Sequence, residues 1–118
     1  MTGMIAWNPA ELGFEQIPTG DHTVSLMHLL AEPETGMEIA IVRYESGEIT
    51  PLHFHECGHG MYIISGRIRT TGSVHGPGEV LWFPEGCVDE HGATEDGPAQ
   101  VFFFTNKPFN ITLIEQGH

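Results

Sequence analysis

Turn-forming residues interrupt this chain so often that a long helix has no room between them. Fifteen glycines and eight prolines are spread over 118 residues, in turn signals such as Ser46-Gly47 and Gly76-Pro77-Gly78. The runs between the turns are rich in Ile, Val, Phe, Tyr and Thr, which favour strands. Many short strands at a spacing of roughly 8–12 residues are typical of a sandwich or barrel, so the sequence predicts an all-β fold.

We expect eight strands, each a run of strand-favouring residues between two turn signals. They cover His22–Leu30, Met37–Glu45, Ile49–His55, Gly60–Ser65, Arg67–Thr71, Glu79–Phe83, Ala99–Thr105 and Phe109–Glu115. The segment Trp7–Phe14 can hold one helical turn, because Asn8 is a suitable cap and Pro9 suits the first helical position. A chain of this length without a linker is expected to form a single domain, residues 1–118.

Charge and hydrophobicity argue against several classes of partner. Sixteen Asp and Glu against four Lys and Arg give a net charge of −12. Phosphate backbones and acidic membrane surfaces would repel such a chain, so we expect neither nucleic acid nor a membrane as partner. Residues 1–10 contain no Lys or Arg and no long apolar run, which is unlike a signal peptide, so the expected location is cytoplasmic.

Three of the eight histidines lie within seven residues, at His53, His55 and His59. In a strand, His53 and His55 project from the same face about 6.5–7 Å apart, and two such imidazoles can converge on one metal ion. Gly58 allows a tight reversal that can bring His59 back beside them on the next strand. Three exposed histidines on a polar loop are the simpler alternative, but so dense a cluster between two strands favours a metal site.

The glycines around this cluster have a regular spacing that resembles the two cupin motifs. Gly47, five residues, His53-Phe54-His55, three residues, His59, six residues and Gly66 resemble the first motif, and Gly78, five residues and Pro84-Glu85-Gly86 resemble the start of the second. The chain thus looks like a cupin with motif one at about 47–66 and motif two at about 78–91. It is most similar to the small ChrR-type and dihydroxyacetophenone-dioxygenase-like cupins. The resemblance implies a double-stranded β-helix, a small jelly-roll barrel, with a metal ion near one mouth.

Two positions depart from the cupin pattern. The glutamate of the first motif is replaced by His59, and the histidine position of the second motif holds Asp89, with His91 two residues later. We expect His91 to complete the site because imidazole is the better ligand for a divalent transition metal, with Asp89 then orienting an imidazole N–H. The alternative is that Asp89 itself is the ligand. Both sets favour Fe(II), with Zn, Ni and Mn as the other candidates.

These features lead to the hypothesis of a metal-dependent dioxygenase. It would act on a small oxygenated organic molecule, a diketone, an enol or a hydroxyaryl ketone, at a His-rich centre. The alternatives are a non-catalytic metal- or ligand-binding cupin that serves as a sensor or stabilising module, and a metal-dependent isomerase or lyase. Tyr62 is a candidate catalytic residue if its hydroxyl points into the barrel, and Glu90 is a candidate base. Exposed strand edges also favour a homodimer.

The remaining candidate residues are less specific. In a cupin, Cys57 and Cys87 would lie near the site, where a thiolate ligand would favour Zn or Cu(I), but we interpret both as unreactive, partly buried thiols. His28 shares a face with apolar residues of its strand and is expected to be a hydrogen-bonded histidine of the core or a pocket wall. His75 lies in a turn and is expected to be solvated. Several large apolar and aromatic residues lie on the predicted barrel strands, and about half of them must point inward. They are Met61, Tyr62, Trp82, Phe83, Phe102, Phe103 and Phe104.

Overall fold

Strand-favouring runs separated by turns give a structure built almost wholly of strands. The computed structural model describes residues 3–19, 22–54, 57–107 and 112–113. Its strands are β1 (Glu15–Thr19), β2 (His22–Ala31), β3 (Glu38–Tyr44), β4 (Ile49–Phe54), β5 (His59–Ser65), β6 (Ile68–Thr70), β7 (Val74–His75), β8 (Val80–Phe83), β9 (Asp89–Ala93), β10 (Ala99–Thr105) and β11 (Thr112–Leu113). The predicted all-β class is confirmed.

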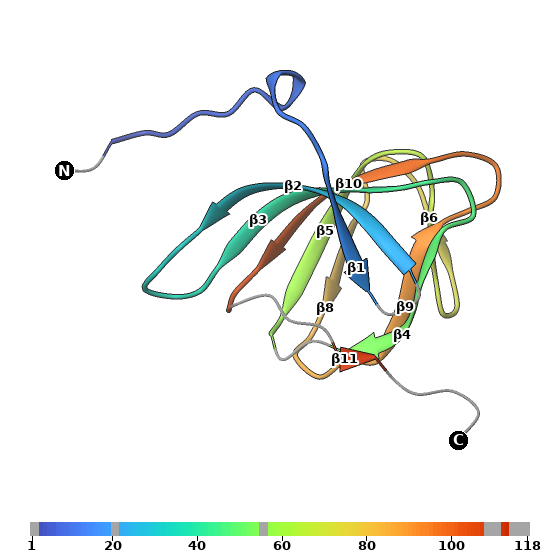
Figure 1. The fold of residues 1–118 in the computed structure, drawn as a ribbon. Coiled ribbons are helices and arrows are strands. Elements are labelled where there is room, and N and C mark those ends of the chain that lie inside the picture. Colours follow the sequence, from blue (N-terminus) through green and yellow to red (C-terminus); the bar gives the residue numbers. More distant parts are fainter. Residues whose placement is uncertain (1–2, 20–21, 55–56, 108–111, 114–118) are drawn as a thin grey trace.

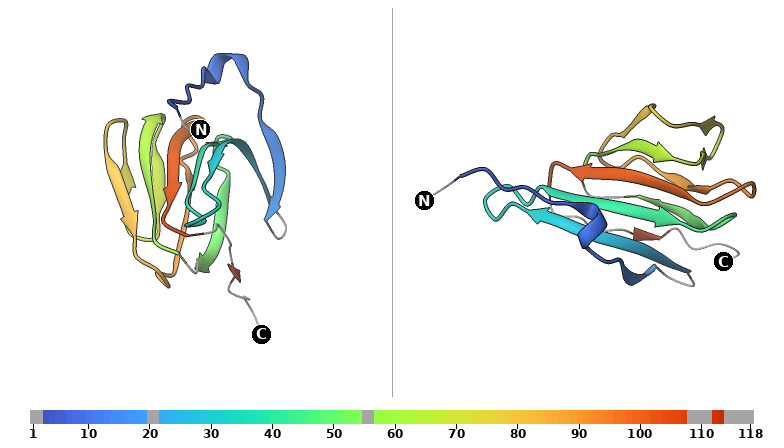
Figure 2. Two further views of the ribbon diagram at one scale, coloured as in Figure 1. Left: turned by 90° about the vertical axis from the view of Figure 1, so that its left-hand side faces the viewer. Right: turned by 90° about the horizontal axis from the view of Figure 1, so that it is seen from above.

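Strands that are far apart in the sequence pair side by side, and every pairing is antiparallel. The large sheet has the order β1-β2-β3-β10-β5-β8, and the small sheet has the order β11-β4-β9-β6-β7. β10 lies between β3 and β5, and β9 lies between β4 and β6, so late segments of the chain complete both sheets. The two sheets curve around a shared interior (Figures 1 and 2), as expected for a jelly-roll barrel.

The core lies where the inner faces of the two sheets meet. On the large sheet, Val101 of β10 is opposite Val42 of β3 and Ile63 of β5, so these three side chains share the inner face. The small sheet contributes Ile68 of β6 and its partner Ala93 of β9. Val101, Ile63 and Ile68 are completely buried. Burial of a side chain of this size stabilises the fold by about 1.5–3 kcal/mol, so this cluster holds the two sheets together.

Gly66, the last glycine of the spacing around the histidines, closes the turn after β5. Its φ is +74°, and a Cβ there would lie 2.1 Å from the carbonyl oxygen of Pro98. Other residues would therefore meet both a strained backbone conformation and a direct clash. The glycine spacing that suggested the family thus has a steric basis at this position.

Three strands, β1, β7 and β9, were not predicted from the sequence. β1 contains Pro18, which interrupts the strand pattern, but β1 pairs only with β2 at the sheet edge, where proline is tolerated. β7 has only two residues. β9 reads Asp-Glu-His-Gly-Ala, a run of low strand propensity. It forms a strand because β4 and β6 supply backbone partners on both sides.

The two ends of the described chain agree with the predicted elements where they can be compared. Pro9–Glu11 forms a 3-10 turn (η1), and the Asn8 side chain accepts a hydrogen bond from the N–H of Ala10 at 3.1 Å, which confirms the expected helical turn. Of the predicted strand Phe109–Glu115, Thr112–Leu113 forms β11 and the rest lies outside the described residues. Within the described ranges, no helix is long and apolar enough to span a membrane.

Candidate functional site

Two histidines from opposite sheets lie next to each other in the core. His59 begins β5 and is 2% exposed, and His91 in β9 is 5% exposed. Their ring centroids are 6.4 Å apart. Phe83 stacks on His59 with centroids 4.8 Å apart and an interplanar angle of 8°, and Phe103 lies 5.3 Å from the same imidazole. The structure therefore brings two of the predicted metal ligands together between aromatic walls.

Strand register explains how both imidazoles reach the interior. His59 is opposite Thr105 of β10, and alternation along β5 puts it on the same face as Met61, which is completely buried. His91 is opposite Thr50 of β4, and both are buried. The pairing of β5 in the large sheet and β9 in the small sheet thus directs one imidazole from each sheet toward the other.

Tyr44, the last residue of β3, holds the ring of His91. Its hydroxyl lies 2.8 Å from Nδ1 of His91, and both side chains are buried. The hydroxyl donates to Nδ1 or accepts from an Nδ1–H, according to the tautomer. Burial and the negative charge of Glu48 raise the pKa of Tyr44, against the effect of a hydrogen bond with Thr50. The phenol therefore stays neutral, and Nε2 is the nitrogen of His91 that can bind a metal ion.

The other two predicted ligands are placed only in part. His53 lies in β4, where its backbone is opposite Asp89 of β9 and Leu113 of β11. The side chain of His53 and the whole of His55 lie outside the described residues. Within the described part of the chain, no group of three or more His, Cys, Asp and Glu residues is arranged to hold a metal ion. The four-histidine ligand set therefore stays a prediction.

Asp89, the alternative to His91, is bonded to the turn that follows β6. Its Oδ1 accepts hydrogen bonds from the backbone N–H groups of Thr71, at 2.9 Å, and Glu90, at 2.7 Å, and from the hydroxyl of Thr71. The expected contact of Asp89 was with an imidazole N–H, and the contact that the structure describes is with this turn. Of the two candidates, His91 is the one that lies beside His59 in the core.

Neither of the two candidate catalytic residues points into the barrel, so the condition stated for Tyr62 is not met. Tyr62 lies opposite Phe102 on the outer face of the large sheet and is 44% exposed, because Met61 takes the inner position. Glu90 alternates with His91 along β9, so its side chain lies on the opposite face from the buried imidazole. Neither position fits the catalytic role that the sequence suggested.

An apolar cavity of about 180 Å³ is bordered by Phe103, the ring that packs against His59. Its walls are Ile17, Leu26, His28, Glu38, Ala40 and Phe103. His28 and Glu38 form a hydrogen-bonded pair with 3.1 Å between Nε2 and Oε1, and their side chains are 44% and 25% exposed. The prediction that His28 is a hydrogen-bonded histidine of a pocket wall is confirmed.

A second cavity, of about 330 Å³, is bordered by Phe83, the other ring beside His59. Cys87 lines this cavity, and burial together with the charge of Asp89 raises the pKa of its thiol. Cys57 is completely buried, and neither Cys57 nor Cys87 forms a disulfide. A raised pKa leaves little reactive thiolate at neutral pH, which agrees with the interpretation of Cys87 as an unreactive residue.

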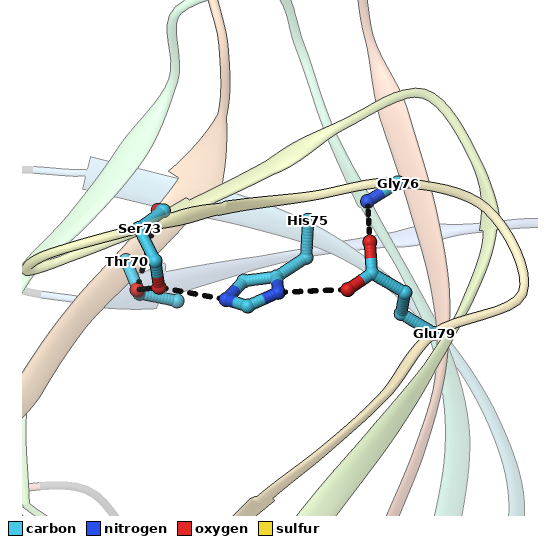
Figure 3. A network of polar contacts seen from close by, with 5 residues as sticks. All are labelled: Thr70, Ser73, His75, Gly76 and Glu79. Carbon is cyan, nitrogen blue, oxygen red and sulfur yellow. Dashed lines mark hydrogen bonds and ion pairs between the residues drawn. The ribbon is translucent and has the colours of Figure 1, made fainter.

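His75 lies in the short strand β7 and not in a turn as predicted, and its partly exposed ring has both nitrogens hydrogen-bonded (Figure 3). Nε2 lies 2.7 Å from Oγ of Ser73, and Nδ1 lies 3.0 Å from Oε1 of Glu79. Glu79 also accepts a hydrogen bond from the N–H of Gly76 at 2.5 Å, and these contacts lower the pKa of Glu79. The network fastens β7 to the turn that leads into β8.

Sequence reasoning missed two residues of the site, Tyr44 and Glu38. Both lie on β3, and alternation places them on the same face as Ala40 and Val42. A tyrosine or a glutamate on an otherwise apolar strand face needs a polar partner once it is buried. That signal could have marked both positions, although it could not have named His91 and His28 as the partners.

Comparison with known proteins agrees with this architecture. The sequence profile of the ChrR cupin-like domain family matches residues 2–110. A cupin-like protein of unknown function from Ralstonia eutropha is 24% identical, with a TM-score of 0.74 over 90% of this chain and 70% of that one. The polyketide cyclase RemF from Streptomyces resistomycificus is 17% identical, with a TM-score of 0.80 over 98% and 88%.

A third similar structure is a candidate acetylacetone dioxygenase from Methylibium petroleiphilum. It is 12% identical, with a TM-score of 0.76 over 98% of this chain and 85% of that one. Identities below 25% show a shared fold and nothing more specific. A search among curated proteins gives no significant match.

Proposed function

The chain belongs to the ChrR cupin-like domain family, and from this premise we propose that it is a metal-dependent dioxygenase of small oxygenated molecules. The substrates would be diketones, enols or hydroxyaryl ketones. The observation that carries the proposal is the pair of buried imidazoles, His59 and His91, from opposite sheets. The likeness in fold to a candidate acetylacetone dioxygenase supports the choice of substrate class.

The nearness of the two described imidazoles supports the proposal that they share a metal ion. Rings that bind one ion at roughly 90–110° have centroids about 5 Å apart, given metal–nitrogen bonds of about 2.1 Å. The centroids of His59 and His91 are 6.4 Å apart. The rings would therefore have to come about 1 Å closer to share one ion. His53 and His55 would complete the ligand set from β4 and the segment that follows it.

The donor set indicates which metal such a site would hold. Imidazole nitrogens suit Fe, Ni, Zn and Cu better than Mg or Ca. When bound, Fe(II) supplies a redox-active ion with open positions for dioxygen and a chelating substrate, so it is the metal that fits oxygenase chemistry. An all-imidazole set adds no negative charge and leaves the ion a stronger Lewis acid than a site that contains a carboxylate.

The surrounding residues position the ligands and keep water away. In the tautomer that leaves Nε2 of His91 for the metal, Nδ1 carries the proton and donates it in a hydrogen bond to the oxygen of Tyr44. Phe83 and Phe103 cover the imidazole of His59. A substrate beside these rings would meet apolar walls, where each remaining electrostatic interaction is stronger than in water.

The test is oxygen uptake by protein reconstituted with Fe(II) without air and then given a panel of β-diketones and hydroxyaryl ketones. The expected result is substrate-dependent uptake that the change His59→Ala abolishes and the change His75→Ala preserves. The second variant is the matched control, because His75 is a hydrogen-bonded histidine outside the core. Absence of uptake over the whole panel, with the metal bound, would contradict the dioxygenase proposal.

The depth of the two imidazoles supports a second candidate function, a metal-binding module without catalysis. His59 and His91 are nearly inaccessible to solvent, and structural metal sites are closed by four protein ligands. Small probe ligands such as azide distinguish the two functions. A spectral change of the reconstituted metal on addition of azide indicates an open position, and an unchanged spectrum indicates a closed centre. Turnover without oxygen would instead indicate an isomerase or lyase.

A further inference from the structure

The cavity of about 180 Å³ beside Phe103 has the size and chemistry of a specific ligand site. We propose that it binds a small, neutral, largely apolar molecule with one enol or phenol hydroxyl, and that the His28–Glu38 pair recognises this hydroxyl. The inference rests on the proposed function for its substrate class. The cavity, however, can be tested without metal or oxygen.

The volume of the cavity, which is partly open to solvent, is enough for one ring or a molecule of similar size. A cavity of about 150 Å³ lined by aliphatic and aromatic residues is known to bind benzene, and this one is slightly larger. Ile17, Leu26, Ala40 and Phe103 form its apolar walls. Phe103 also lies 5.3 Å from His59, so a molecule in the cavity would be one ring away from the proposed metal centre.

The polar pair lies where the cavity meets solvent. Nε2 of His28 is 3.1 Å from Oε1 of Glu38, and both side chains are partly exposed. The position of Glu38 is fixed by its backbone N–H, which donates to Oγ1 of Thr105 at 3.0 Å, and Thr105 belongs to the same strand as Phe103. The pair is thus anchored to the strand that separates the cavity from His59.

The charge of the pair predicts selectivity. Within the pair, Nε2 of His28 donates to Oε1 of Glu38, and the carboxylate keeps lone pairs that can accept, so the hydroxyl of an enol or phenol would be bound as a donor. A ligand with its own carboxylate would be repelled by Glu38, in a chain that already carries a net charge of −12. Neutral hydroxy ketones should therefore bind, and keto acids or hydroxy acids of the same size should not.

The experiment is calorimetric titration of chelator-treated protein with 4′-hydroxyacetophenone, whose hydroxyl is available as a donor, and with salicylate, which is similar in size and carries a negative charge. We expect binding of the first and little binding of the second. The change Ala40→Leu fills the cavity and should weaken binding about tenfold or more, and Glu38→Gln should weaken it roughly fivefold and improve the relative binding of salicylate. The matched control is Glu79→Gln, which alters a second His–Glu pair outside this cavity.

Each outcome separates this inference from the proposed function. Equal binding by wild type, Ala40→Leu and Glu38→Gln, or tighter binding of salicylate than of the ketone, would overturn the cavity proposal. Because the titration contains no metal, selective binding would uphold the cavity even if the reconstituted protein took up no oxygen. In that case only the dioxygenase proposal would fail.

A separate observation concerns the N-terminal arm, residues 3–14, which carries large apolar side chains in the open. Figure 1 shows the arm leaving β1 and running past the ends of the sheet strands. Its exposed apolar residues are Met4 (93%), Ile5 (63%), Trp7 (39%), Leu12 (43%) and Phe14 (36%). Single exposed apolar residues are common, but so many on one short segment indicate a contact surface.

The outer face of the large sheet at β10, β5 and β8 is a matching apolar surface. Phe104 and Trp82 flank Gly60 in one row, and Phe102, Tyr62 and Val80 form the next. The rings of Phe104 lie 6.4 Å from Trp82 and 6.1 Å from Phe102. Gly60 adds no side chain between the rings, and these two rows contain no acidic residue.

We infer independently that the arm of one copy packs on this outer face of a second copy, in a reciprocal homodimer. Two copies that each carry a charge of −12 repel each other, so a stable contact has to exclude carboxylates and bury apolar surface. The arm and the aromatic rows meet this requirement. A two-fold axis then gives two equivalent arm contacts.

Sedimentation equilibrium of the full chain at about 100 µM tests this inference. Wild type should be a dimer, and Ile5→Asp on the arm and Val80→Asp on the outer face should each shift it to monomer. Val74→Asp is the matched control, since Val74 is also an exposed strand valine but belongs to β7 of the small sheet. A monomeric wild type would refute the reciprocal homodimer, because the arm would then have no second copy to pack on. A dimer that neither change affects would refute it as well.

Discussion

Replacing Tyr44 by Phe removes one buried hydroxyl in the core of the candidate site, which bonds to His91 and to Thr50. The hydroxyl of Tyr44 is 2.8 Å from Nδ1 of His91, and both residues are buried. The change removes one oxygen and keeps the ring, so packing is largely preserved. What is lost is the partner of a buried imidazole nitrogen, and leaving a buried polar group without its partner costs about 1–3 kcal/mol.

Two quantities should change in Tyr44→Phe. With a urea m-value of roughly 1.5 kcal/mol/M, the loss lowers the unfolding midpoint of the metal-free protein by about 0.7–2 M. Removing the group that orients a metal-binding histidine weakens metal affinity by roughly 10–100-fold. The assays are urea unfolding followed by circular dichroism and competitive titration of the metal against a chelator.

Tyr62→Phe is the control for this experiment, because Tyr62 is the second tyrosine of the chain and lies half-exposed on the outer face. It should change neither the midpoint nor the metal affinity. If Tyr44→Phe matched Tyr62→Phe in both assays, the hydrogen bond to His91 would have no energetic role. The account of how β3 orients the site would then be wrong.

Three further predictions concern other parts of the fold. Gly66→Ala should lower the free energy of unfolding, measured in urea, by more than about 3 kcal/mol, because Gly66 has a positive φ and a Cβ there would lie 2.1 Å from a carbonyl oxygen. Gly72→Ala is the control and should have little effect, because a Cβ at Gly72 would meet open space. Cys87 should react with iodoacetamide at pH 8 more slowly than a free cysteine, because burial and a neighbouring carboxylate raise the pKa of its thiol; a rate equal to that of free cysteine would contradict this. Glu79 has a lowered pKa in the folded state, so its contribution is present at neutral pH and lost as the pH falls through the folded pKa. Wild type should therefore exceed Glu79→Gln in unfolding midpoint at pH 7, and the difference should shrink as the pH falls through the folded pKa; a difference that stays constant down to acid pH would refute this.

Much of the fold could be predicted because alternation in this chain is strong where strands are long. The predicted bounds of β2, β3 and β10 agree with the observed bounds to about one residue, because turn residues mark the ends of these strands. β9 was missed because its residues have low strand propensity and its stability comes from β4 and β6, which are distant in sequence. Local preference could not reveal a strand that depends on its neighbours.

The sequence indicated which residue types would form the site, but not which of them point into the barrel. Alternation along β5 separates His59 and Met61 from Tyr62, but both faces of this strand are apolar, so the pattern did not say which face is inside. The outer face is apolar at Phe102 and Phe104 as well. Whether Tyr62 points inward or outward could therefore not be decided from the pattern.

The contacts that shape the site join distant parts of the chain. The hydroxyl of Tyr44 meets His91 across 47 positions of sequence. The pair His28–Glu38 spans a bulged register between β2 and β3. Contacts of this kind depend on how the strands twist and cross, which spacing in the sequence does not encode.

The central claim is that imidazoles from both sheets hold one transition-metal ion. The most direct test is elemental analysis of the purified protein after reconstitution, with His53→Ala, His91→Ala and, as control, His75→Ala measured in parallel. We expect about one metal ion per chain in wild type and in His75→Ala, and a large loss of metal in the other two variants. Full metal content in His91→Ala, or none in a folded wild type, would contradict it.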